Sequence, residues 1–169
     1  QSVLAICRQL PKDQTLRILE IGAGTGGTTT QILPCLEKAG MWNNIEYTFT
    51  DVSPFFLEKA KQQFSDYEGM LYKVLDLETN SLDQGFDAGS YDLILGINVV
   101  HATRDIKQVL NNIEQLLVPG GLCLLQEAFY KFRFIDVIFG MTDGWWAFTD
   151  HKLRPEHALL NADQWQSTF

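Results

Sequence analysis

Five side chains able to bind ligands or transfer protons stand at or just beyond the ends of short apolar runs: Glu20, Asp51, Asp76, His101 and Glu127. Carboxylates attract cations and accept hydrogen bonds from hydroxyl and amino groups, and a neutral imidazole can remove a proton near neutral pH. If each apolar run is a strand of one parallel sheet, the strand ends lie along one edge. The spacing therefore predicts that these side chains share one ligand site.

The stretch LRILEIGAGTGGTTT, residues 16–30, is central to this arrangement. Its first six residues are typical of a buried strand, and Gly22, Gly24, Gly26 and Gly27 separate them from a pattern of helical length. A strand, a glycine-rich turn and a helix open many nucleotide-binding α/β sheets, because glycine lets the backbone turn tightly and approach a ligand. The first, second and fourth of these glycines also fit the GxGxxG dinucleotide fingerprint.

Glu20 helps to choose between two classes of ligand. A carboxylate two residues before Gly22 would repel the pyrophosphate of a dinucleotide in a closed pocket. It suits a cationic ligand such as S-adenosylmethionine, which carries a sulfonium and an ammonium group. The alternative is that Glu20 only hydrogen-bonds amides of the loop; we favour the methyl donor.

Two further acidic positions could hold a nucleoside. Asp51 follows the alternating segment IEYTFT and can accept hydrogen bonds from both ribose hydroxyls. Asp76 and Leu77 follow another apolar segment, where the carboxylate can accept from the amino group of adenine and a neighbouring amide can donate to a ring nitrogen. Either acid alone could equally be an ordinary loop residue, so the interpretation depends on the glycine turn.

Apolar runs and helical patterns alternate along the chain, which predicts an α/β protein with a parallel, doubly wound, Rossmann-like sheet and right-handed crossovers. Pro34 should kink its helix or shift its start, and residues 119–121 (PGG) should end the last helix. We expect strands at 16–21, 45–50, 70–75, 91–95 and 122–126, and helices at 2–10, 28–38, 54–64 and 105–117.

Composition excludes several functions. The 169 residues suffice for one domain, and a formal charge of −8 without a basic run argues against nucleic acid as a partner. No apolar run is long enough to span a membrane, and no signal peptide opens the chain. Cys7, Cys35 and Cys123 lie far apart and none pairs with a nearby histidine, which predicts reduced packing residues in a cytoplasmic protein and no metal site.

An aromatic-rich segment follows residue 128, and it has two interpretations of equal weight. It could form the wall of a chamber for a partly apolar substrate, or it could cover the sheet. The segment contains Phe129, Tyr130, Phe132, Phe134, Phe139, Trp145, Trp146 and Phe148.

Five motifs together resemble the C-methyltransferase domain of modular polyketide synthases, a branch of the class I S-adenosylmethionine-dependent methyltransferases. They are ILEIGAGTGGTT, YTFTDVS, YDLILGINVVHAT, LLVPGGLCLLQE and DGWWAFTD. The resemblance extends from Leu16 to Trp165, and five motifs in register are far more specific than the glycine loop alone.

The resemblance implies methyl transfer from S-adenosylmethionine to the α-carbon of a β-ketoacyl chain, held as a thioester on an acyl carrier protein beside other synthase domains. S-adenosylhomocysteine is then the product. A histidine after the fourth strand and a glutamate after the fifth form the family's catalytic dyad, which implies that role for His101 and Glu127. The implied donor-binding residues are Glu20, Gly22, Ala23, Gly24, Gly26, Asp51, Asp76, Leu77 and Asn98.

The required chemistry agrees with this choice of base. An α-carbon between a ketone and a thioester must lose a proton before it attacks a methyl group. A neutral imidazole suits that step, and a carboxylate on its other nitrogen fixes the tautomer. A lone loop histidine is also often structural, and His151 and His157 are further candidates, but we favour His101.

The chain departs from the family pattern at both ends. Family members usually continue into a C-terminal antiparallel hairpin and carry an N-terminal lid, and neither is evident in this sequence. We therefore expect residues 1–169 to be a single partial domain whose fifth strand has an unpaired edge. Three alternatives stay open: a small-molecule O- or N-methyltransferase, a non-catalytic scaffold module, and a nicotinamide-dependent oxidoreductase.

Overall fold

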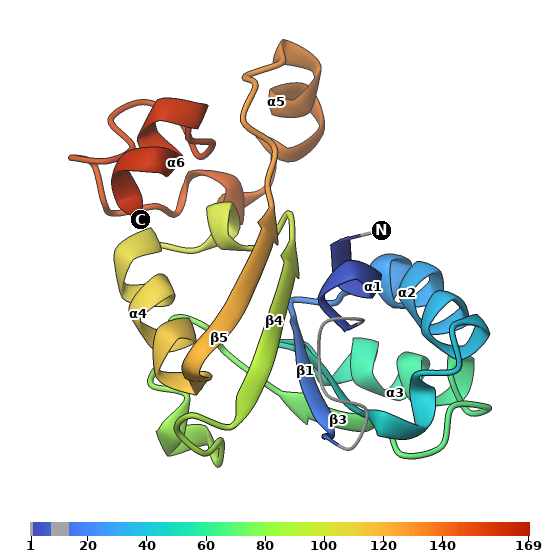
Figure 1. The fold of residues 1–169 in the computed structure, drawn as a ribbon. Helices are drawn as coiled ribbons and strands as arrows, with labels where there is room; N and C mark the ends of the chain where they lie inside the picture. Colours follow the sequence, from blue (N-terminus) through green and yellow to red (C-terminus); the bar gives the residue numbers. More distant parts are fainter. Residues whose placement is uncertain (1, 8–13) are drawn as a thin grey trace.

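A computed structural model describes residues 2–7 and 14–169 of the chain. Its centre is a five-stranded parallel sheet in the order β3-β2-β1-β4-β5 (Figure 1). The doubly wound sheet predicted from the sequence is confirmed. The strands are β1 (Leu16–Ile21), β2 (Ile45–Asp51), β3 (Leu71–Val74), β4 (Tyr91–Ile97) and β5 (Leu117–Gln126).

Helices cover both faces of this sheet. In Figure 1, α1, α2 and α3 lie on one side and α4 on the other, while α5 and α6 lie beyond the carboxyl ends of β4 and β5. None of the helices described has the length and apolar composition needed to cross a membrane. The helices are α1 (Ser2–Cys7), α2 (Gly27–Lys38), α3 (Pro54–Gln63), α4 (Ile106–Leu116), α5 (Arg133–Phe139) and α6 (Ala162–Thr168).

The central strand β1 is buried on both faces because its side chains alternate between two cores. Leu16 and Ile18 pack into the core beneath α1, α2 and α3. Leu19 and Ile21 pack into the core beneath α4. All four are at most 5% exposed, which explains why the segment reads as an almost continuous apolar run.

The order of the strands creates a switch point between β1 and β4. The chain runs outward from β1 through β2 to β3, then returns to the other side of β1 to form β4 and β5. The connections after β1 and β4 therefore leave the sheet in opposite directions. Ligands of open α/β sheets bind in the crevice that this opens at the carboxyl ends of the strands.

Several predicted boundaries hold, and one is wrong. Helix α2 continues through Pro34, and Asp105 caps α4 by accepting a hydrogen bond from the Gln108 N–H. The last strand, however, begins at Leu117 and contains residues 119–121, which we expected to precede it. An edge strand tolerates proline and irregular pairing, and the register of β5 against β4 shifts near Tyr91.

Three further expectations concern the first helix, the edge strand and the cysteines. The predicted helix over 2–10 is seen as α1, whereas residues 8–10 lie outside the described residues. Strand β5 lies at an edge of the five-stranded sheet, as expected. Cys35 is exposed on α2, so its prediction as a packing residue is wrong; Cys123 is partly buried.

The aromatic segment divides into buried and exposed parts. Trp145 and Phe148 pack in a small third core together with Leu159. The residues of this third core belong to no strand of the sheet, so both interpretations of the segment stay predictions. The other six aromatic side chains are each at least 44% exposed: Phe129, Tyr130, Phe132, Phe134, Phe139 and Trp146.

The turn after β1 depends on a glycine at its first position. Gly22 has a φ of 55°, and a Cβ placed there would overlap the side chain of Val99 from the loop after β4. Gly40, at the end of α2, has a similar φ of 68° but open space where a Cβ would lie. An alanine at Gly40 would therefore add backbone strain alone, whereas an alanine at Gly22 would add the same strain and a steric overlap.

We predict that Gly22→Ala destabilises the fold more than Gly40→Ala does. Gly40→Ala adds only the strain of a left-handed alanine, about 1–2 kcal/mol. Gly22→Ala adds the displacement of Val99, about 1–3 kcal/mol more. Urea denaturation of both variants measures the difference. Equal losses would mean that the contact between Gly22 and Val99 imposes no constraint.

Candidate active site

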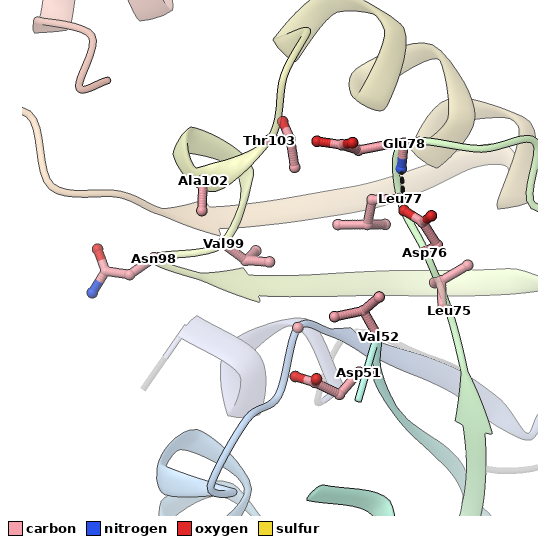
Figure 2. Close-up of a pocket in the computed structure, with 11 residues that line it drawn as sticks. Asp51, Val52, Leu75, Asp76, Leu77, Glu78, Asn98, Val99, Ala102 and Thr103 are labelled. Carbon is pink, nitrogen blue, oxygen red and sulfur yellow. Dashed lines mark hydrogen bonds between the residues drawn. The ribbon is translucent and has the colours of Figure 1, made fainter. Parts of the chain in front are cut away.

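A cavity of about 360 Å³ opens at the carboxyl ends of the strands, at the lower end of the range typical of small-molecule sites. In Figure 2 its walls come from the ends of β1, β2 and β4 and from the segments after β3 and β4. Five predicted donor-binding residues line it: Gly22, Asp51, Asp76, Leu77 and Asn98. Its other lining residues are Val52, Leu75, Glu78, Val99, Ala102 and Thr103.

The carboxylate of Asp51 is held by the backbone on both sides. Its Oδ2 accepts a hydrogen bond from the Gly24 N–H at 2.9 Å, and its Oδ1 accepts from the Ser53 N–H at 2.9 Å. Each oxygen retains a further lone pair. The side chain is therefore fixed at the end of β2 and can accept hydroxyl donors from a ligand in the cavity.

The backbone of Asp76 is held by a single glutamine. Gln84 accepts from the Asp76 N–H at 2.8 Å and donates to the Asp76 carbonyl at 2.9 Å. Asn112 on α4 donates to the Leu77 carbonyl at 2.9 Å, and the Asp76 carboxylate accepts from the Glu78 N–H. These contacts hold the acid and the following amide at the wall of the cavity.

The rest of the glycine loop lies behind that wall. The Ala23 N–H donates to the Thr50 carbonyl at 2.9 Å, which fastens the loop to β2. Ala23, Gly24 and Gly26 do not line the cavity. Gly26, the N-cap residue before α2, has a φ of 76°, and a Cβ there would lie 2.8 Å from the ring of Phe64.

Glu20 lies deeper than we expected. It is 2% exposed and does not line the cavity; its Oε2 accepts from the Thr29 hydroxyl at 2.5 Å and from the Tyr47 hydroxyl at 2.7 Å. Burial raises the pKa of Glu20, and the two hydroxyl donors oppose that shift. This arrangement therefore does not support direct contact between Glu20 and a cation in the cavity. Glu20 instead joins the strand to α2 beneath the loop.

Asn98 reaches the cavity but turns its side chain elsewhere. Its Oδ1 accepts from the Ala128 N–H at 3.0 Å, and Figure 2 shows the side chain pointing away from the acidic residues. Among the described residues, Asn98 is the one non-glycine residue with a positive φ, which is 52°. Asparagine tolerates this conformation better than most residues. Asn98 thus shapes the turn after β4 and joins it to the segment after β5.

His101 and Glu127 meet as the sequence predicted. His101 lies in a 3₁₀ turn, Val100–Ala102, and its Nδ1 is 2.5 Å from the Glu127 Oε2. The Glu127 Oε1 accepts from the Val99 and Val100 N–H groups at 3.0 and 2.8 Å. One carboxylate therefore holds both the imidazole and the backbone that carries it. Ala102 and Thr103, directly after His101, line the cavity.

This pairing has a direct chemical consequence. A carboxylate that already accepts two N–H groups is best matched by an imidazole that donates from Nδ1. Nε2 then carries the lone pair and can accept a proton. Trp145 lies edge-on to the imidazole, 5.7 Å between ring centroids, and limits how the ring can turn.

The other two histidines are placed differently. His151 is exposed. His157 is buried, with Nε2 2.9 Å from the Asp136 Oδ1 and with Nδ1 accepting from the Leu159 N–H at 3.0 Å. Both ring nitrogens of His157 are therefore engaged. Throughout residues 2–7 and 14–169, no group of three or more His, Cys, Asp or Glu side chains is arranged to hold a metal ion.

Two supporting residues were missed from the sequence. Asn112 interrupts the buried stripe of α4 with a polar side chain, and this signal was available. Gln84 lies in a short 3₁₀ turn, Leu82–Gln84, among ordinary polar loop residues and gives no such signal.

Comparison with known proteins identifies the family of the chain. A family model described as a methyltransferase domain matches residues 19–123. The highly reducing polyketide synthase lcsB of Purpureocillium lilacinum is 42% identical over 151 residues, which cover 89% of this chain and 6% of the synthase. The methyltransferase calH of Penicillium decumbens is 40% identical over 154 residues, which cover 90% of this chain and 42% of calH.

Solved structures give the same result. The CurJ carbon methyltransferase matches with a TM-score of 0.93 and 46% identity, over 98% of this chain and 43% of that one. The CalH trans-methyltransferase, solved with SAH, matches with a TM-score of 0.83 and 36% identity, over 91% of this chain and 43% of that one. The chain thus spans less than half the length of these relatives. It belongs to the methyltransferase domain family, and its similarity is to the C-methyltransferase domains of polyketide synthases.

Proposed function

We propose that this chain contributes to methyl transfer from S-adenosylmethionine to the α-carbon of a β-ketoacyl thioester carried by an acyl carrier protein. The observation that carries the proposal is the buried pair of His101 and Glu127 beside the cavity. We further propose that residues 1–169 are one partial domain of a multidomain synthase. The similarity to a segment of the lcsB synthase supports this assignment.

The cavity fits an adenosyl compound. Asp51, held by two backbone amides, can accept the ribose hydroxyls. Asp76 and the N–H of Leu77 can meet the edge of adenine, and Val52 and Val99 add apolar surface. When bound, S-adenosylmethionine supplies an electrophilic methyl group. The complex of CalH with SAH supports the same class of donor here.

The dyad supplies what carbon methylation requires. The Nε2 of His101 takes the proton from the α-carbon, and the electron pair of that C–H bond becomes available to attack the methyl group. Glu127 stabilises the resulting imidazolium through Nδ1. A positioned base of this kind contributes about 10²–10⁴ in rate. Methylation of oxygen or nitrogen needs less help with proton removal, so the buried dyad favours carbon.

We predict that His101→Ala strongly slows methylation but retains the donor site. Turnover should fall about 10²–10⁴-fold, because the base is lost. Intact-mass analysis of a β-ketoacyl carrier protein, incubated with the protein and S-adenosylmethionine, measures the gain of one methyl group. Calorimetry with S-adenosylhomocysteine should give nearly wild-type affinity.

His151→Ala is the matched control for this experiment, because it removes an exposed imidazole from the same chain. It should methylate at the wild-type rate. Wild-type turnover in His101→Ala would exclude the dyad as the source of the base.

We predict that Glu127→Gln impairs catalysis almost as strongly as His101→Ala, because it changes the tautomer of His101. The amide oxygen can still accept from Val99 and Val100, but the NH₂ group then faces Nδ1 of His101. Nε2 must then carry the proton and cannot accept another. We expect a loss of about 10²–10⁴ in kcat with little change in stability. Retention of wild-type kcat would show that the tautomer of His101 is set by another group.

Glu20→Gln tests whether the charge beneath the loop contributes to donor binding. The pKa of Glu20 is higher in the folded than in the unfolded chain, so the charged form costs stability at neutral pH. That cost disappears as the pH falls through the raised pKa toward the unfolded value. Glu20→Gln should therefore be at least as stable as wild type at about pH 7, with a smaller difference at about pH 4.

The affinity of the same variant for S-adenosylmethionine should stay close to that of wild type, because Glu20 lies behind the cavity wall. Calorimetry measures that affinity and denaturation at both pH values measures stability. A selective loss of affinity for the sulfonium ligand, with S-adenosylhomocysteine unaffected, would restore the direct electrostatic role.

A further inference from the structure

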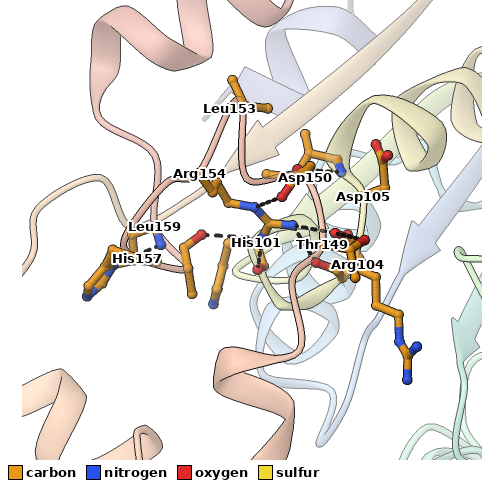
Figure 3. Close-up of polar contacts among 12 residues, drawn as sticks. His101, Arg104, Asp105, Thr149, Asp150, Leu153, Arg154, His157 and Leu159 are labelled. Carbon is orange, nitrogen blue, oxygen red and sulfur yellow. Dashed lines mark hydrogen bonds and ion pairs between the residues drawn. The ribbon is translucent and has the colours of Figure 1, made fainter.

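Arg154 is a buried arginine outside the described cavity, with oxygen acceptors around its guanidinium and the ring of Phe148 against it, 5.1 Å from the central carbon to the ring centroid. The residue is 1% exposed and lies in the segment between the 3₁₀ turn Asp143–Trp146 and α6. Its Nε donates to the Asp150 Oδ1 at 2.6 Å, so the charge is paired. Figure 3 shows the guanidinium in the middle of a group of backbone and side-chain oxygens.

Apart from a long contact of 3.4 Å from Nη1 to the Ala158 carbonyl, the remaining donors of Arg154 bind the turn that carries His101 and the two residues after it. Nη1 donates to the carbonyl of His101 itself at 2.8 Å. Nη2 donates to the carbonyls of Thr103 and Arg104 at 2.7 and 3.0 Å. Carbonyl oxygens gathered this closely repel one another, and only a planar cation with several donors can neutralise and bridge them at once.

We propose that Arg154 is a positioning residue for His101, an inference that rests on the proposed function. Glu127 holds the imidazole at Nδ1, and Arg154 holds the same residue at its carbonyl. His101 is thereby held at two points, its ring by Glu127 and its backbone by Arg154. The aim of Nε2 toward a substrate then depends on Arg154, although Arg154 touches neither the cavity nor the imidazole ring.

The partner of Arg154 extends this arrangement to α4. Asp150 uses Oδ1 for Arg154 and Oδ2 to accept from the Ile106 N–H at 3.1 Å, at the first residue of the helix. The Thr149 N–H also donates to the Arg104 carbonyl at 2.8 Å. The segment at 149–154 therefore holds the whole connection from the 3₁₀ turn to α4. A lysine could keep the charge but could not reproduce the fork of donors.

The test compares Arg154→Lys and Arg154→Met with Arg17→Met. Arg17 at the amino end of β1 also pairs with an aspartate, Asp92, through two side-chain contacts of 3.1 Å, but lies at the opposite end of the sheet. Arg17→Met therefore controls for the loss of an arginine–aspartate pair. Turnover is measured on a β-ketoacyl carrier protein, and the affinity for S-adenosylhomocysteine by calorimetry.

A third measurement reports on the geometry directly. The proton on Nδ1 of His101, hydrogen-bonded to Glu127, should give a downfield NMR resonance that is absent from Glu127→Gln. We expect both Arg154 variants to lose about 10- to 100-fold in kcat, with affinity for S-adenosylhomocysteine within about threefold of wild type. Their Nδ1 proton resonance should broaden or disappear. Arg17→Met should keep kcat and the resonance even where its stability falls.

Two results would overturn the proposal. Wild-type kcat in Arg154→Lys and Arg154→Met would mean that His101 needs no such support. A loss of kcat with the resonance intact, or with an equal loss of affinity, would mean that Arg154 acts only on the general fold. Should Arg154→Met not fold, Arg154→Lys, which retains the buried charge, decides the matter. If wild type transfers no methyl group, the proposed function fails, and the resonance alone still judges the positioning role.

Discussion

One carboxylate, that of Glu127, holds together the part of the site in which a proton can be transferred. It stands at the end of an edge strand, which by itself gives little rigidity, yet it accepts hydrogen bonds from Val99, Val100 and His101. Hydrogen bonds to a charged group contribute about 1.5–3 kcal/mol each, and leaving the partners buried without it costs a similar amount. The loop after β4 is thereby tied to the end of β5, and the tautomer of the imidazole is set by the same contact.

The fold and the gathering of the site residues could be predicted because both follow from short-range signals. A buried central strand is apolar throughout, a tight turn needs glycine at positive φ, and parallel strands end along one edge. Those three facts bring Gly22, Asp51 and Asp76 to one cavity, and they place His101 directly before the lining residues Ala102 and Thr103. Glu20 lies outside the cavity for a related reason. Alternation along β1 directs its side chain into the core beneath α2, although its place before the glycines suggested the ligand.

The supporting contacts could not be predicted, because they join residues far apart in the chain through backbone atoms. Arg154 binds carbonyl oxygens of residues about fifty positions earlier, and every residue type presents the same carbonyl. Gln84 holds the backbone of Asp76 from only eight residues away, but it too binds through main-chain atoms, and the polar Asn112 on α4 gave a signal that did not name its partner, the Leu77 carbonyl. A sequence pattern reports which side chains are polar or apolar. It does not report where a polar side chain finds a carbonyl, and that depends on packing already achieved.

The switch point in the strand order explains why the site has two halves. The predicted donor residues come mainly from β1, β2 and the end of β3, whereas the imidazole and its carboxylate come from the segments after β4 and β5. The two halves meet most closely in the strand order at the boundary between β1 and β4, and there Gly22 faces Val99 without room for a Cβ. A group transferred from one half to the other must cross this boundary. The absence of a side chain at Gly22 therefore lets the two halves come close. Glu127 and Arg154 hold the segment after β4 in place through hydrogen bonds. Closeness and rigidity thus have separate causes in this fold, and a variant can lose one while it keeps the other.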